Sequence, residues 1–141
     1  MPDGATIGFD TNAIIYCIEQ NPLYVPVVQP VFERAISGLL TAHVSVVSLI
    51  EVLVKPLREE HGALAGQYRA LLTRSFGITM HNLDEQISER AATIRARWNL
   101  RVPDAIVAAT ALWSGATHLV TNDPDLKRVE DLKVLVIDDY V

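Results

Sequence analysis

The stretch RVPDAIVAATA, from Arg101 to Ala111, joins a helix start to an almost unbroken run of small apolar residues. Pro103 stands near the first helical position, where the missing N–H of proline costs nothing. The residues after it predict a helix that is buried on most of its surface. Asp104 is the only acidic residue of the stretch. It either complements the positive end of the helix dipole or binds a ligand, and both interpretations are open.

Strands and helices alternate along the rest of the chain. Short apolar or β-branched segments predict strands at residues 5–9, 42–47, 78–81, 118–121 and 133–137. Helical spacing of apolar residues predicts helices at 12–19, 25–40, 49–59, 63–74, 84–98 and 103–113. Pro56 is expected to kink or end the helix in which it lies. This order is typical of a single α/β domain over residues 1–141, with a central, mainly parallel five-stranded sheet flanked by helices.

Composition excludes several classes of protein. The chain has 141 residues, a net charge of −5 and one cysteine, Cys17, so an intrachain disulfide is impossible. A single cysteine fits a reducing cytoplasm, and no apolar run approaches the roughly 18 residues of a membrane span. We therefore expect a cytoplasmic protein that makes no membrane contact. The glycine-rich nucleotide-binding motifs and the G-x-S-x-G motif of serine hydrolases are absent.

Four acidic residues follow predicted strands or begin predicted helices: Asp10, Glu51, Asp104 and Asp123. Ligands bind at the carboxyl ends of parallel strands, so such a sheet can gather these side chains at one edge. Clustered carboxylates repel one another unless they share protons or bind a cation. Oxygen ligands suit Mg²⁺ or Mn²⁺. None of the four histidines has zinc-ligand spacing to another, so we expect structural or surface roles for all of them.

Each acidic residue also has a structural interpretation. Ser48 and Glu51 match a capping box, and Asn122 or Asp123 can cap a helix with Pro124 near its first position. Taken singly, Glu51 and Asp123 are better explained as caps. Asp10 can be a turn residue, but it stands between two apolar segments, where a charge needs a partner. The four together favour a site over four unrelated caps.

The motifs that carry these residues resemble those of the PIN-domain ribonucleases, most closely the VapC-type toxins of prokaryotic toxin–antitoxin pairs. The similar segments cover nearly the whole chain, in order: FDTNAIIY, SVVSLIEVL, VPDAIVAATAL and HLVTNDPDLKRVEDLKVL. The resemblance implies a parallel sheet with strand order 3-2-1-4-5. It also implies that the chain hydrolyses RNA phosphodiester bonds as a Mg²⁺- or Mn²⁺-dependent endoribonuclease, the toxin of a type II pair.

The resemblance assigns roles to residues and implies partners. Asp10, Glu51, Asp104 and Asp123 become catalytic and metal-binding. Polar side chains that support them are Thr11, Asn12, Ser48, Thr121 and Asp125. Asp125 is also an alternative to Asp123 for the residue that points into the site, and Asp123 is preferred. The implied partners are the RNA substrate, a cognate antitoxin protein and a second copy of the chain in a homodimer. Local positive charge suggests that the RNA passes Arg95, Arg97 and Arg101.

Three rival functions are compatible with the sequence. A non-catalytic PIN-like module would bind RNA or protein without cleaving it, although no carboxylate of the motif is lost. A Mg²⁺-dependent phosphotransfer domain would use Asp10 as the phosphorylated residue. Asn12 argues against a haloacid-dehalogenase-like phosphatase, because that class has a second aspartate two residues after the first. In the third, the acidic residues are only helix caps.

Overall fold

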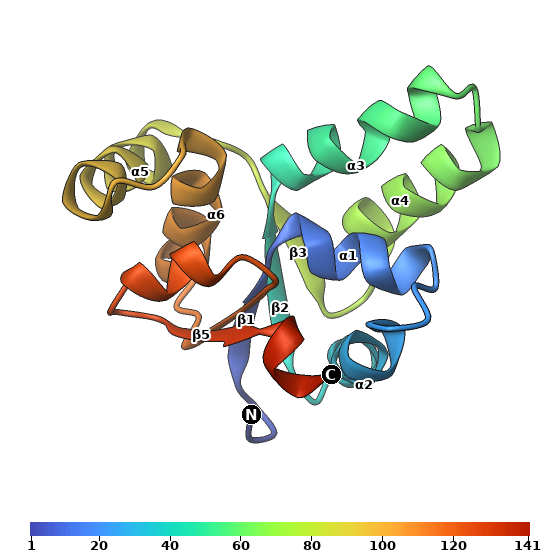
Figure 1. The fold of residues 1–141 in the computed structure, drawn as a ribbon, viewed down its shortest axis with the longest axis horizontal. Helices are drawn as coiled ribbons and strands as arrows, with labels where there is room; N and C mark the ends of the chain where they lie inside the picture. The colour runs from blue at the N-terminus through green and yellow to red at the C-terminus, as the bar shows by residue number, and fades with distance from the viewer.

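Five strands form one parallel sheet in the computed structural model, which describes residues 1–141 (Figure 1). The strands are β1 (Thr6–Phe9), β2 (Thr41–Ser45), β3 (Ile78–His81), β4 (His118–Thr121) and β5 (Lys133–Val136). Their order is β3-β2-β1-β4-β5, and every neighbouring pair is parallel. This confirms the expected fold class and the strand order implied by the resemblance.

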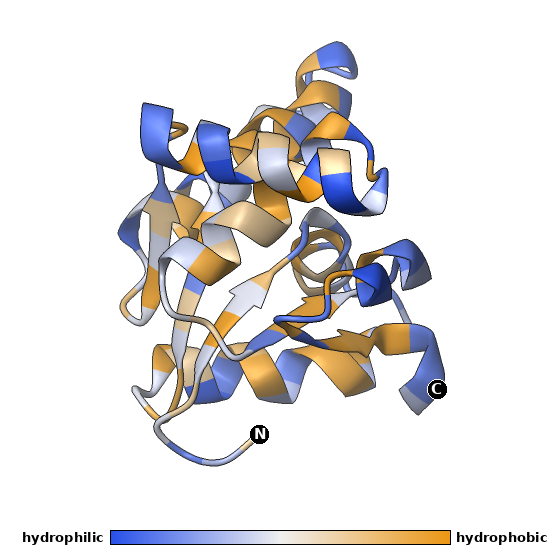
Figure 2. Cartoon of the chain, turned by 90° about the vertical axis from the view of Figure 1, so that its left-hand side faces the viewer, coloured by the Kyte–Doolittle hydropathy of each residue, from blue (hydrophilic) through white to orange (hydrophobic).

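Helices cover both faces of the sheet, and each face has its own apolar core. The helices are α1 (Thr11–Ile18), α2 (Val25–Ile36), α3 (Val46–Arg58), α4 (Gly62–Arg74), α5 (Glu85–Trp98) and α6 (Val102–Trp113), with short 3-10 helices η1 (Pro124–Arg128) and η2 (Ile137–Tyr140). One core joins the strands to α1, α2, α3 and α4, and the other joins them to α5, α6 and the η1 region. Figure 2, viewed from the α5 and α6 side, shows many hydrophilic residues on the outer helices and apolar residues on the strands behind them.

Helix α6 is the most buried helix, as the opening sequence stretch predicts. Its residues from Asp104 to Ala111 are all buried. It lies so close to the central strand that a Cβ atom on Gly8 of β1 would stand 2.8 Å from Cβ of Ala111. Small residues on the helix and glycine on the strand are therefore both needed for this contact. The same contact fixes the helix start that carries Asp104 relative to the strand that ends before Asp10.

The largest differences from the sequence-based prediction lie at the end of α2 and at the junction of β2 and α3, and most other bounds agree to within one residue. Helix α2 ends at Ile36 rather than at residue 40, and the chain turns at Gly38 with a φ of +86°. Strand β2 ends at Ser45 because its hydroxyl accepts a hydrogen bond from the N–H of Val47, which starts α3 at Val46. Pro56 does not end α3, which continues to Arg58. It lies in the last turn, where it removes only one backbone hydrogen bond.

None of the helices combines the length and the apolar content that crossing a membrane requires.

Candidate active site

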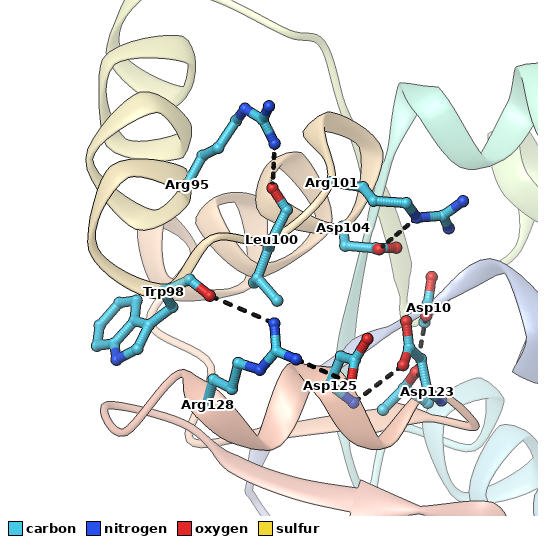
Figure 3. Close-up of polar contacts among 10 residues, drawn as sticks. Asp10, Arg95, Trp98, Leu100, Arg101, Asp104, Asp123, Asp125 and Arg128 are labelled. Atoms are coloured by element: carbon cyan, nitrogen blue, oxygen red, sulfur yellow. Dashed lines mark hydrogen bonds and ion pairs between the residues drawn. The ribbon is translucent and has the colours of Figure 1, made fainter.

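The predicted acidic residues come from four separate elements at the carboxyl edge of the sheet. Asp10 follows β1 and caps α1, whereas Asp123 follows β4 and caps η1. Glu51 lies in the second turn of α3, and Asp104 in the first turn of α6. Figure 3 shows the carboxyl groups of Asp10, Asp104 and Asp123 directed toward a common region. The strand order explains this meeting, because β1 lies between β2 and β4 and its end faces the elements that follow both.

Asp10 is held in place by one hydrogen bond to each of its oxygens. Oδ1 accepts from the backbone N–H of Thr11 at 2.7 Å, and Oδ2 accepts from the hydroxyl of Thr121 at 2.7 Å. The Thr121 hydroxyl also accepts from the backbone N–H of Asp123 at 3.0 Å. Thr121 therefore links the positions of two acidic residues that lie far apart in the sequence.

Asp10 carries its charge at a cost, because only 7% of the residue is exposed. Burial is the main cause that raises its pKa above the ordinary value, and the hydrogen bonds from Thr121 and Thr11 oppose this shift. The negative charges of Asp104 and Glu51 raise the pKa further. A cation at this place would offset both the cost of burying the Asp10 charge and its repulsion by Asp104 and Glu51.

Glu51 is oriented by the hydroxyl of Thr11, which Ser48 contacts in turn, rather than by a helix cap. Thr11 donates its hydroxyl hydrogen to Oε1 of Glu51 at 2.7 Å and stands 2.9 Å from the hydroxyl of Ser48. Thr11 has one hydroxyl hydrogen, so Ser48 must donate to Thr11 in the second contact. The capping-box interpretation of Ser48 and Glu51 is wrong, because α3 begins at Val46 and its cap is Ser45.

Asp104 pairs with a positive charge at the mouth of the site. Nε of Arg101 stands 3.1 Å from Oδ2 of Asp104, and the Arg101 side chain is 78% exposed while that of Asp104 is 11% exposed. The hydrogen bond to Asp104 is the main cause that raises the pKa of Arg101, and the charges of Asp123 and Glu51 add to it. Arg101 therefore lies within electrostatic reach of three of the four acidic residues.

The side chains of Asp123 and Asp125 have different surroundings. Asp123 accepts a hydrogen bond from the backbone N–H of Asp125 at 2.9 Å, so it does cap η1, and its carboxyl group also faces the site (Figure 3). Asp125 is exposed and pairs with Arg128 at 3.3 Å. Asp125 thus contacts a neighbouring surface arginine, whereas Asp123 lies with the other carboxylates.

The remaining predicted residues lie around this group. Asn12 is half-buried in the first turn of α1. Arg95 donates to the backbone carbonyl of Leu100 at 2.5 Å, and the guanidinium of Arg97 lies 4.8 Å from the centre of the Trp98 ring. Arg95 and Arg97 therefore belong to the carboxyl end of α5, and only Arg101 contacts an acidic residue of the site.

Asn122 and Tyr16, which the sequence does not indicate as site residues, hold the segment between Thr121 and Asp123 in place. Asn122 donates to the hydroxyl of Tyr16 at 3.1 Å and accepts from the backbone N–H of Asp138 at 2.9 Å. Asn122 stands between Thr121 and Asp123, so these bonds fix that segment to α1 and to η2. Both residues lie inside the motifs quoted above, but nothing in the sequence shows that they touch.

The donor set suits a hard divalent cation. It consists of carboxylate and hydroxyl oxygens, with no histidine or cysteine. No three metal-ligating side chains lie close enough to enclose an ion as they stand. Mg²⁺ tolerates this, because it keeps several of its waters and is usually held by only one or two carboxylates. The residues therefore fit a hydrated ion rather than an all-protein cage.

Comparisons with known proteins agree with this geometry. The family model of the PIN domain matches residues 7–132. A chain of the VapBC2 complex from Rickettsia felis, bound to a promoter DNA fragment, superposes with a TM-score of 0.71 at 16% identity and covers 93% of this chain and 98% of that one. A chain of a toxin–antitoxin complex from Klebsiella pneumoniae gives 0.71 at 22%, covering 93% and 97%. VapC20 of Mycobacterium tuberculosis, a toxin that cleaves the sarcin–ricin loop, gives 0.71 at 16%, covering 87% and 94%. No curated protein matches the chain significantly.

Proposed function

Because the chain belongs to the PIN-domain family, we propose that it is a Mg²⁺- or Mn²⁺-dependent endoribonuclease, the toxin of a type II toxin–antitoxin pair. The observation that carries this proposal is the meeting of four carboxylates from four elements, one of which is buried and has a raised pKa. An RNA phosphate cannot enter so acidic a place unless a cation accompanies it. The similarity to toxin–antitoxin complexes, and to a toxin that cleaves RNA, supports the same conclusion.

The roles of the acidic residues follow from their surroundings. Asp10 and Asp104, the two most buried, would hold the ion directly. The chemistry that such an ion supplies is neutralisation of the phosphate charge and a lower pKa for the attacking water. Glu51 is more exposed and would orient a water and accept its proton. The hydroxyl of Thr11, held by Ser48, fixes the direction of its carboxylate. Asp123 would bind a water on the opposite side.

The arginines are proposed to bind RNA on the α5–α6 side of the site. Arg101 stands at the mouth of the site, and its exposed guanidinium is available to a phosphate. Arg95 and Arg97 lie one helix away and would contact nucleotides farther along the strand. Positive charge placed beside an acidic site gives the RNA a path to it despite the net charge of −5.

The antitoxin and a second copy of the chain are the proposed protein partners. Helix α3 presents Ile50, Val54 and Leu57 as exposed apolar side chains at helical spacing. Such a stripe is typical of a helix that packs against another protein. Because α3 also carries Glu51, a partner bound along this helix would lie beside the active site.

A phosphotransfer domain fits this structure less well. A phosphorylated aspartate needs one carboxylate oxygen that is free to attack phosphorus. Both oxygens of Asp10 accept hydrogen bonds from within the chain, from Thr11 and Thr121. Each oxygen keeps a lone pair for an ion, but the two hydrogen bonds fix the carboxylate in one orientation, which favours a ligand over a nucleophile that must approach phosphorus.

The decisive experiment is cleavage of a labelled RNA by the purified chain with Mg²⁺, with Mn²⁺ and with EDTA. We expect cleavage with either ion and none with the chelator. Asp123→Asn should abolish cleavage, and Asp125→Asn, two residues away on the same segment, should preserve it because Asp125 only pairs with Arg128. Full RNA cleavage in EDTA would contradict the proposed metal-dependent mechanism. Metal-dependent RNA binding without cleavage would favour the non-catalytic alternative.

A further inference from the structure

Two histidines form a pair outside the carboxylate site. Nδ1 of His43 on β2 stands 2.7 Å from Nε2 of His81 on β3, and the rings are tilted by 36° with their centres 4.9 Å apart. In the sheet register, His43 pairs with Thr79 and Ser45 with His81, so the two histidines are diagonal neighbours on one face. Both residues are half-buried. The pair therefore consists of two imidazole nitrogens that face each other across adjacent strands.

The pair lies on the face of the sheet that carries α6. Ala42 and Val44, which flank His43 in the sequence, point into the core shared with α1 to α4, so His43 points to the opposite face. Helix α6 packs on β1 and β2, whereas β3 is the outer strand of the sheet. His81 at this edge is reachable from solvent. The side chains of the two histidines hydrogen-bond to each other and not to the carboxylates of the site.

We propose that His43 and His81 form a second metal site, which binds a borderline transition-metal ion such as Zn²⁺ or Ni²⁺ and not Mg²⁺. Neutral imidazole nitrogen prefers these ions, whereas the carboxylate site offers only oxygen ligands. In the ion-free pair one histidine donates its N–H to the other. Moving that proton to the far nitrogen of the same ring leaves both facing nitrogens with a lone pair.

The rings need to move little to hold an ion. Zinc–nitrogen bonds of about 2.0–2.1 Å at a tetrahedral angle separate two ligand nitrogens by about 3.3 Å. The present separation is 2.7 Å, so the two nitrogens must move apart by about 0.6 Å and both rings must turn toward the ion. No third metal-ligating residue stands beside the pair, so waters would complete the shell. The site should therefore bind reversibly rather than as a permanent structural centre.

An ion bound to both histidines would link β3 to β2 next to Ser45, a residue that helps to position the active site. Ser45, which pairs with His81 in the sheet, caps the helix that carries Glu51. The metal site is thus joined to the start of α3 through one sheet pair. The inference does not depend on the proposed nuclease function, because ion binding at the pair can be measured without RNA.

The test is titration calorimetry with NiCl2 and with ZnCl2 at pH 7.5, on the full chain without a histidine tag and in excess MgCl2. We expect one ion per chain, and about tenfold or weaker binding in His43→Asn and His81→Asn. His61→Asn is the matched control: His61 only caps α4, which Asn can also do, so its affinity should not change.

A second measurement covers variants that fold poorly. Paramagnetic Ni²⁺ added to the wild-type chain should broaden the imidazole proton signals of His43 and His81 before those of His61 and His118. No binding by the wild type at 1 mM ion, unchanged affinity in both pair variants, or broadening centred elsewhere would each overturn the proposal. In those cases the contact is only a hydrogen bond between strands. If the wild-type chain binds Ni²⁺ at the histidine pair but does not cleave RNA, only the proposed nuclease function is contradicted.

Discussion

Replacing Asp104 by Asn separates a catalytic role from a structural one. The substitution keeps the volume of the side chain and removes its charge. Its cost in stability should be small. The favourable interaction with the helix dipole, about 0.3–1 kcal/mol, is lost. The pair with Arg101 contributes little, because the Arg101 side chain is 78% exposed and solvent screens it. Against this, Asp104 is one of the charges that raise the pKa of Asp10, so its removal relieves a repulsion.

We therefore expect the metal-free free energy of unfolding to change by no more than about 1 kcal/mol. For a chain of this length that is a shift of about 3–4 °C in the thermal midpoint. Cleavage of RNA should nevertheless fall by about 100-fold or more, because the charge that develops at the phosphate loses its compensation. The stabilisation that saturating Mn²⁺ adds to the wild type should shrink as well.

Both quantities are measured on one preparation, the thermal midpoint in EDTA and the cleavage rate with Mn²⁺. Arg101→Gln is the control for stability alone, because it breaks the same ion pair and leaves the carboxylate in place, whereas its cleavage rate also reports the proposed contact of Arg101 with RNA. An Asp104→Asn variant that is clearly less stable but cleaves RNA within a few-fold of the wild-type rate would refute the role of Asp104 as a ligand. Its carboxylate would then serve only the helix dipole.

Three other perturbations have defined outcomes. Gly8→Ala places a Cβ 2.8 Å from that of Ala111 and should lower the unfolding free energy by about 1–3 kcal/mol in urea denaturation; an unchanged midpoint would mean that α6 moves freely. Burial, and next to it the charge of His81, lowers the pKa of His43, so below about pH 6.5 the unfolded chain binds more protons than the folded one. The free energy of unfolding should therefore fall as the pH drops below about 6.5, and this fall should be less steep in His43→Asn. Arg97→Gln should weaken metal-free RNA binding and reduce its salt slope by about 1 in fluorescence anisotropy, whereas an equal slope returns Arg97 to ordinary surface.

The architecture was predictable because each element leaves its own local pattern. The strands at Ile78–His81 and His118–Thr121 have the predicted bounds, and the burial of α6 follows from its small apolar residues. The boundary between β2 and α3 was not predictable. Val46 and Val47 are β-branched and favour a strand, but the Ser45 hydroxyl caps a helix at the same place. Two local preferences competed there, and the tertiary structure decided between them.

The candidate site was predictable only as a set of residue types. The positions of the acidic residues after strands and at helix starts indicate that they can meet. The contacts that orient them join residues far apart in the chain, as Thr11 does with Ser48 and Glu51, at separations of 37 and 40 positions. The approach of His43 to His81 depends on strand pairing in the same way. Spacing along the sequence carries no information on such contacts.

The central place of β1 has a consequence for the time at which the proposed active site forms during synthesis of the chain. Asp10 belongs to one of the first segments to leave the ribosome, but its Oδ2 is held by Thr121, which is made 111 residues later. At about 5–20 residues per second, roughly 6–20 s separate the two. Until then β1 lacks its β4 neighbour, and the segment that carries Asp123 does not exist. A chain that cleaves RNA as proposed therefore cannot cut its own message until most of the chain has been translated.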